Sequence, residues 1–159
     1  MDLMLRGREL DDAKKKAAGL KNWILTPRQV CDLELLLNGG FWPLKGFLGR
    51  KDYDRVVLEM RLASGTLWPM PVALDLPGVE ASSVKAGSGL TLKDPDGTAL
   101  AILEVEDVYQ PDKVREAQVV FGTQDKTHPG VSFLLERAGS HYIGGVLKGL
   151  ALPRHEDYP

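Results

Sequence analysis

The stretch LTPRQVCDLELLLNGGFWPLKGFLGRKDYDRVV, residues 25–57, contains two helix patterns joined by a loop of glycine and aromatic residues. Thr26 and Gln29 occupy the first and last positions of a capping box, and Pro27 suits the first position inside a helix. Apolar residues follow at helical spacing: Val30, Leu33 and Leu37. Asn38-Gly39 then supplies the left-handed residue on which many helices end. These signals predict a helix that begins after Thr26 and ends at Asn38-Gly39.

The loop after this helix raises the question of a ligand site, because it carries one lysine among glycines and aromatic residues. Lys45 alone is a poor cradle for an anion, and the first glycines are already explained as the end of the helix. Gly46 and Gly49 allow the chain a tight path. We therefore expect a structural corner, with an apolar plug packed between the two helices and the rest of the fold: Phe41, Trp42, Leu44 and Phe47.

A second helix is predicted after the loop, ending near Ser64-Gly65. Four residues at helical spacing form its apolar face: Tyr53, Val56, Val57 and Met60. Beyond it the apolar residues alternate instead, at Val72, Leu74 and Leu76, which indicates a strand. Pro69 and Pro71 place the start of that strand at an edge or outside the sheet, because proline cannot donate to a ladder.

Two more strands are predicted on either side of the turn Asp94-Pro95-Asp96-Gly97. Ala99 to Val105 is apolar on both faces, so we expect it to be a central strand. Pro111 to Phe121 reads as a short helix that ends at Gly122, with three residues facing inward: Val114, Ala117 and Phe121. The tail HYIGGVLKGLALP, residues 141–153, reads as a strand interrupted by a bulge at Gly144-Gly145.

Helices followed by mostly short strands indicate the α+β class, with the sheet curled into a barrel-like form. Residues 1–22 are charged and weakly periodic, and form either a helix or a loose arm. A chain of 159 residues suits one domain, with room for a second small subdomain, and we expect the folded part to span residues 23–159.

The overall charge argues against a nucleic-acid partner. The net charge is −2, and residues 104–125 carry six acids and two bases, a net of −4. Such a segment repels phosphates, whereas nucleic-acid binding needs many Lys and Arg contacts to them. Lys14-Lys15-Lys16 is short, lacks interleaved aromatic residues, and is expected to be a solvated helix face.

Cysteine content and hydropathy favour a cytoplasmic protein. Cys31 is the single cysteine, which excludes a disulfide within the chain and fits a reducing compartment. No run of 18 apolar residues is present, so no membrane partner is expected. The start MDLMLRGREL lacks the apolar core of a signal peptide.

No set of residues reads as a catalytic, substrate-binding or metal site. His128, His141 and His155 lack metal-ligand neighbours at close spacing, so a zinc site requires that they converge in space. Cys31 lies near the start of a helix, where the dipole lowers a thiol pKa, but a buried structural thiol is the commoner case. Gly87 and Gly89 lack the third glycine of a dinucleotide fingerprint and suit a turn.

Three carboxylates could serve acid–base chemistry if two of them converged on a cleft: Glu104, Glu106 and Asp107. The simpler interpretation is a solvent-facing strand edge.

Longer blocks of sequence carry more information than these short patterns. CDLELLLNGGF, FGTQDKTHPGV and HYIGG stand within a region, Leu25 to Pro153, that resembles the N-terminal part of ATP sulfurylase (sulfate adenylyltransferase). The resemblance implies a PUA-like pseudo-barrel of short strands with packed helices. It also implies a parent enzyme that joins sulfate to the α-phosphate of ATP, with Mg²⁺, giving adenosine 5′-phosphosulfate and pyrophosphate.

The family's catalytic motifs, Gln-x-Arg-Asn and His-x-x-His, do not occur in this chain. In the family they lie in a following nucleotidyltransferase domain, and the last residues here, RHEDYP, fall near the point where that domain would begin. The Pro-His-Gly-Gly often present near the family's N-terminus is replaced by LRGREL. We therefore expect a segment that is inactive alone, holds no cofactor, and has the catalytic domain or a neighbouring subunit as its partner. The alternative is a stand-alone PUA-like module that binds RNA or a protein.

Overall fold

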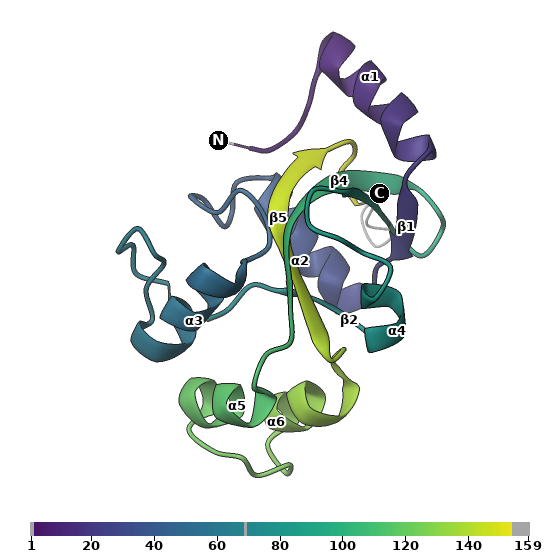
Figure 1. Ribbon diagram of the computed structural model, residues 1–159. Helices are drawn as coiled ribbons and strands as arrows, with labels where there is room; N and C mark the ends of the chain where they lie inside the picture. Colours follow the sequence, from purple (N-terminus) through teal and green to yellow (C-terminus); the bar gives the residue numbers. More distant parts are fainter. Residues whose placement is uncertain (1, 69, 154–159) are drawn as a thin grey trace, which may run out of the picture. The chain divides into compact units, whose positions relative to one another are not determined.

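The computed structural model describes residues 2–68 and 70–153 (Figure 1). The chain forms two compact units: Met1–Gly46, Gly87–Val105 and Gly145–Pro159 make unit 1, and Phe47–Ala86 and Glu106–Gly144 make unit 2. The elements follow in the order α1 Gly7–Ala18, β1 Lys21–Ile24, α2 Pro27–Leu37, α3 Arg50–Glu59, β2 Leu74–Leu76, α4 Gly78–Ala81, β3 Gly89–Lys93, β4 Ala99–Tyr109, α5 Lys113–Phe121, α6 Pro129–Ser132, the π-helical turn η1 Phe133–Arg137 and β5 His141–Gly149.

The strands form one sheet in the order β1–β3–β4–β5–β2. β1 pairs with β3 in parallel, whereas β3 with β4 and β2 with β5 are antiparallel. The turn that contains Gly97 joins β3 to β4, and β4 lies between two neighbours with Leu100 to Leu103 buried. The structure thus confirms the α+β class, the central strand and the edge position of the strand around Leu74. Pro69 lies outside the described residues.

In unit 1, α2 begins and ends as its sequence predicts. The Thr26 hydroxyl accepts from the Gln29 backbone N–H, and the Gln29 side chain accepts from the Thr26 N–H at 3.0 Å. Gln29 is buried, and its Oε1 also accepts a hydrogen bond from the indole N–H of Trp23 at 2.9 Å. Gly39 takes φ 88 and ends the helix. Leu33, Leu36 and Leu37 complete its buried face.

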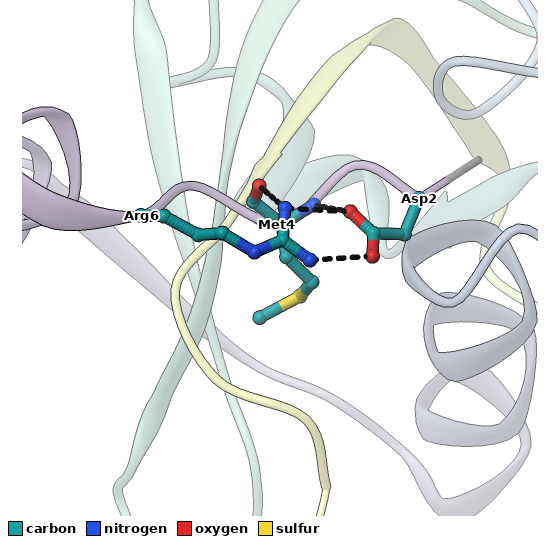
Figure 2. A network of polar contacts seen from close by, with 3 residues as sticks. All are labelled: Asp2, Met4 and Arg6. Carbon is teal, nitrogen blue, oxygen red and sulfur yellow. Dashed lines mark hydrogen bonds and ion pairs between the residues drawn. The ribbon is translucent and has the colours of Figure 1, made fainter.

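The N-terminal residues are tied to unit 1 by backbone hydrogen bonds. The Leu3 N–H donates to the Leu37 carbonyl at 2.9 Å, and the Leu5 N–H donates to the Gly149 carbonyl at 3.0 Å. Asp2 and Arg6 form a bidentate ion pair whose shorter contact is 2.7 Å, across Met4 (Figure 2). Helix α1 follows, and its Ala13 and Ala17 pack with Ile102 and Leu150. Of the two forms expected for the N-terminal segment, a helix is present at Gly7–Ala18.

The apolar plug expected in the α2–α3 loop is only partly correct. Leu44 and Phe47 are buried, and Phe41 is half-buried. Trp42 is 45% exposed, so it does not fold inward.

In unit 2, α3 ends earlier than predicted. Tyr53, Val56 and Val57 form its buried face, as their spacing indicates. Met60 does not continue that face: it adopts the left-handed conformation with φ 54, and its side chain points to solvent. The next residues form a small hairpin in which Arg61 pairs with Leu67.

The predicted interruption of the last strand at Gly144-Gly145 is wrong, because β5 runs unbroken from His141 to Gly149. Its glycines serve close packing instead. In unit 1, a Cβ on Gly46 would overlap the carbonyl of Gly145; in unit 2, a Cβ on Gly144 would lie 2.5 Å from the Gly49 Cα. Only residues without side chains allow such backbone contacts.

Helix α5 also differs from its predicted face. Ala117 is buried and Gly122, with φ 72, follows the helix as expected. Val114 is 48% exposed, however, and Glu116 is buried in place of an apolar residue. Helix α4, helix α6 and η1 were not predicted; α5 and α6 pack side by side in unit 2 (Figure 1).

Candidate functional site

His128 and His141 have local structural partners. The His128 Nδ1 accepts from the Gly130 N–H at 3.1 Å and caps α6, and its ring packs on Phe121. The His141 Nδ1 lies 2.7 Å from the Ser140 hydroxyl. His155 lies outside the described residues. Within residues 2–68 and 70–153, no three His, Cys, Asp or Glu side chains gather to hold a metal ion.

The three candidate carboxylates are not brought together for catalysis. Glu104 forms an ion pair with Lys148 at 2.7 Å. The Asp107 Oδ2 accepts from the Arg50 N–H at 2.8 Å and so caps the start of α3. Glu106 is exposed.

The expectation of a buried thiol is wrong: Cys31 is exposed. The buried face of α2 consists of Gln29, Leu33, Leu36 and Leu37, and position 31 lies away from it. Lys45 is also exposed, as are Lys14, Lys15 and Lys16, which confirms the solvated face of α1. Gly87 has φ 88 and lies just before β3, as a turn residue does.

Unit 2 contains a cluster of titratable side chains that sequence reasoning missed. The hydroxyls of Tyr53 and Tyr142 both donate to the Glu116 Oε1, the second at 3.0 Å. Tyr109 packs on both tyrosines, with ring centroids 5.5 and 5.8 Å away, and donates its own hydroxyl to the Leu48 carbonyl at 2.8 Å. All four side chains are buried. We call Tyr53, Tyr109, Glu116 and Tyr142 the tyrosine cluster.

The electrostatics of the tyrosine cluster keep its phenols protonated. Burial raises the pKa of Tyr53 and Tyr142, and the neighbouring Glu116 charge raises both further. Burial, followed by the Asp107 charge, raises the pKa of Tyr109. Each phenol is therefore a permanent hydrogen-bond donor at neutral pH. No buried side-chain nitrogen or oxygen among the described residues lacks a partner, so the cluster is satisfied without a ligand.

A small pocket of about 70 Å³ lies beside the cluster, within unit 2. It is lined by Arg50, Tyr53, Asp54, Val57, Leu58, Tyr109, Gln110, Pro111, Asp112 and Arg115. Small-molecule sites usually need about 300 Å³ or more, so this pocket fits water or the end of one side chain. Its charges also balance, since two arginines face two aspartates. The cluster therefore presents phenols and a carboxylate that are already hydrogen-bonded to one another or to the backbone, beside a space of small volume.

A second, wider hollow of about 300 Å³ lies in unit 1 beside α1. Leu5, Ala13 and Ile102 supply its apolar lining, and charged residues complete it: Glu9, Asp12, Lys16, Glu104 and Lys148. Glu104 and Lys148 neutralise each other there. Among the described residues, no helix is long and apolar enough to cross a membrane.

Comparison with known proteins gives consistent matches along nearly the whole chain. The PUA-like domain family matches residues 1–152. The chain is 48% identical to a sulfate adenylyltransferase of Schizosaccharomyces pombe, over 99% of this chain and 33% of that protein. It is 50% identical to the Saccharomyces cerevisiae sulfate adenylyltransferase, over 86% of this chain and 27% of that protein. The chain therefore spans a third or less of the length of these curated relatives.

Among solved structures, a hexameric APS kinase from Thiobacillus denitrificans is similar to this chain. The TM-score is 0.76 at 27% identity, over 99% of this chain and 27% of that one. The family match agrees with the PUA-like fold that the sequence blocks indicate.

Proposed function

The chain belongs to the PUA-like domain family, and on that premise we propose that it serves as the N-terminal domain of an ATP sulfurylase. The observation that carries the proposal is identity of about half over nearly the full chain, confined to a third of each sulfate adenylyltransferase. The parent reaction converts ATP and sulfate to adenosine 5′-phosphosulfate and pyrophosphate, with Mg²⁺ accompanying the nucleotide.

We assign this segment a structural role in that enzyme. It lacks the Gln-x-Arg-Asn and His-x-x-His motifs of the catalytic domain, so it offers no group to stabilise charge on the phosphoryl centre. The satisfied tyrosine cluster and the small pocket suit a support rather than a reaction site. Its partner is then the catalytic nucleotidyltransferase domain, and its single cysteine fits work in the cytoplasm.

A domain exchange tests the proposal. Three proteins are compared: this chain alone, the S. cerevisiae enzyme without its matching part, and a chimera in which this chain replaces that part. Pyrophosphate release from ATP is measured with sulfate or molybdate. We expect turnover from the chimera and none from the other two.

Two results would overturn the assignment. Robust turnover by this chain alone would show that the segment is itself an enzyme. A folded chimera no more active than the shortened yeast enzyme would show that the segment does not supply the missing domain.

A further inference from the structure

Residues 110–140, which connect β4 to β5 through α5, α6 and η1, have a small apolar core of their own. We call them the helical segment. Its core residues come from all three elements: Ala117, Val131 and Leu134. Helix α6 lies tightly on α5, because a Cβ on Gly130 would be 2.7 Å from the Phe121 Cε1. Val131 and Leu134 therefore stay covered only while α6 keeps its place.

The start of α6 is held by a histidine that must be neutral to hold it. The Gly130 N–H is a donor, so the His128 Nδ1 that accepts it at 3.1 Å carries a lone pair and no proton. The Ser132 N–H donates to the His128 carbonyl at 3.0 Å, and the His128 and Phe121 ring centroids lie 5.0 Å apart. One residue thus fixes the first turn of α6 and joins it to α5.

A proton on the His128 ring removes this support. The Nδ1–H and the Gly130 N–H would then be two donors facing each other, and the new positive charge would lie at the N-terminus of α6, where negative charge is favoured. Phe121 can attract a cation, but its ring gives the Gly130 N–H no replacement acceptor. His128 is exposed, so protons reach it without opening the fold. Histidine is also the side chain whose charge changes between about pH 5 and 8.

The charged groups near His128 already have partners of their own. Those on α5 and its cap, on η1 and in the loop before α6 are Asp112, Lys113, Arg115, Glu116, Asp125, Lys126, Glu136 and Arg137. Asp112 accepts from the Arg115 N–H at 3.1 Å, and Glu116 accepts from the tyrosine cluster. Asp125 accepts from the Thr127 N–H at 2.9 Å, and Glu136 pairs with Lys126 at 3.3 Å. An imidazolium at His128 would therefore compete for carboxylates that other groups hold.

We propose that His128 is an acid-sensitive latch of the helical segment. At neutral pH its Nδ1 caps α6 and keeps Val131 and Leu134 covered. Because the closed segment needs the unprotonated ring, the open segment binds the proton better, and the stability of the closed form falls as pH falls. Below about pH 6, α6 and η1 open locally while the rest of the fold persists.

Amide hydrogen exchange, followed by NMR at about pH 7.5 and about pH 5, tests the latch. Protection factors are compared, so that the direct effect of pH on the exchange chemistry cancels. We expect the Gly130, Ser132 and Phe133 amides to lose about fivefold in protection at the lower pH, which is the loss of one N-cap worth about 1 kcal/mol. The amide of Val57, in α3 of the same unit, keeps its protection.

Three variants assign the effect to the His128 ring. H128N provides a side-chain oxygen that accepts at either pH, so we expect its protection factors to be equal at both. H128A has no acceptor and is expected to show the low protection of the acid form already at the higher pH. H141N changes the other described histidine of unit 2 and is the matched control, which keeps the fall of the wild type.

Equal protection of the wild type at both pH values would overturn the latch. So would a fall at Gly130 alone, with Ser132 and Phe133 unchanged, because the cap would then be lost without any opening of α6. A fall of the same size in H128N would also count against it, since another group would then carry the pH dependence.

Discussion

Glu116 is a carboxylate removed from water, and two phenols replace the solvent around it. Tyr53 and Tyr142 donate to the same oxygen from α3 and β5. Hydrogen bonds to a charged acceptor are stronger than neutral ones, and a buried charge left without them is costly. The two phenols therefore stabilise the buried Glu116 carboxylate within unit 2.

Removing one of the two phenol hydroxyls should cost less than removing the acceptor. We expect Y142F to lower the free energy of unfolding by about 2 kcal/mol, the loss of one charged hydrogen bond. E116A should cost about 4 kcal/mol, because it leaves two buried hydroxyls unpaired and a cavity. Urea unfolding measures both. E116Q keeps the shape of the side chain and an acceptor, so we expect its loss in the free energy of unfolding to fall between those of Y142F and E116A. An E116A chain as stable as the wild type would contradict the stabilising role of Glu116.

Met60 has an unfavourable backbone conformation for a residue with a side chain. At φ 54, the left-handed region costs a non-glycine residue about 1 kcal/mol. We expect M60G to stabilise the isolated chain by about 0.5–1 kcal/mol, since the exposed side chain contributes little to it. Thermal unfolding with M60A as the control measures this, because alanine retains the strain. If M60G destabilises the isolated chain, the Met60 side chain supports the fold.

Elements with local signals were predictable from the sequence, and those fixed by distant contacts were not. The capping box and Gly39 define α2 within the helix itself, and Gly97 marks the β3–β4 turn. Helix α3 shows the limit, because its end depends on the hairpin that begins at Met60. The close packing of the β5 glycines was not predictable either, because the backbone atoms they contact are far away in sequence.

The tyrosine cluster lacked any such local signal. Its members come from α3, β4, α5 and β5, so no spacing connects them. A charged residue on a short helix is normally read as exposed, and Val114 was the natural candidate for the inward position. Glu116 is buried only because phenols from other elements meet it. Long family-specific blocks predicted the PUA-like fold where spacing rules could not.

The close packing of β5 makes a sharp prediction. We expect G144A to destabilise the chain by more than about 3 kcal/mol, because its Cβ would meet fixed backbone atoms rather than a movable side chain. G19A is the control: Gly19 has φ −97, and its added Cβ would find only one atom, at an ordinary 3.8 Å. Chemical unfolding measures the free energy of unfolding of both variants. Equal losses for G144A and G19A would contradict the backbone contact at Gly144.

At the scale of the whole molecule, buried phenols make stability depend on alkaline pH. The pKa values of Tyr53, Tyr109 and Tyr142 are raised above the ordinary value of 10.0. A raised native pKa stabilises the fold at pH below the unfolded pKa. That contribution is lost as pH rises above about 10, where only the unfolded phenol loses its proton. Burial lowers the pKa of Lys113, and a lowered lysine pKa makes the free energy of unfolding rise with pH instead of fall.

The contribution of Tyr109 to this pH dependence can be isolated by comparing the Y109F variant with the wild type. Above about pH 10, the free energy of unfolding of Y109F should fall with pH less steeply than that of the wild type, by about 1.4 kcal/mol per pH unit. Guanidinium unfolding at a series of alkaline pH values gives the two slopes. Parallel slopes would mean that Tyr109 ionises in the native state.

The path of the backbone between the two units has a genetic consequence. The chain passes from one unit to the other four times, at residues 46–47, 86–87, 105–106 and 144–145. Any break made between Phe47 and Gly144 leaves parts of both units on each side of it. Neither unit can be transferred by a single crossover between genes. A single crossover inside that interval would therefore combine parts of both units from each parent gene.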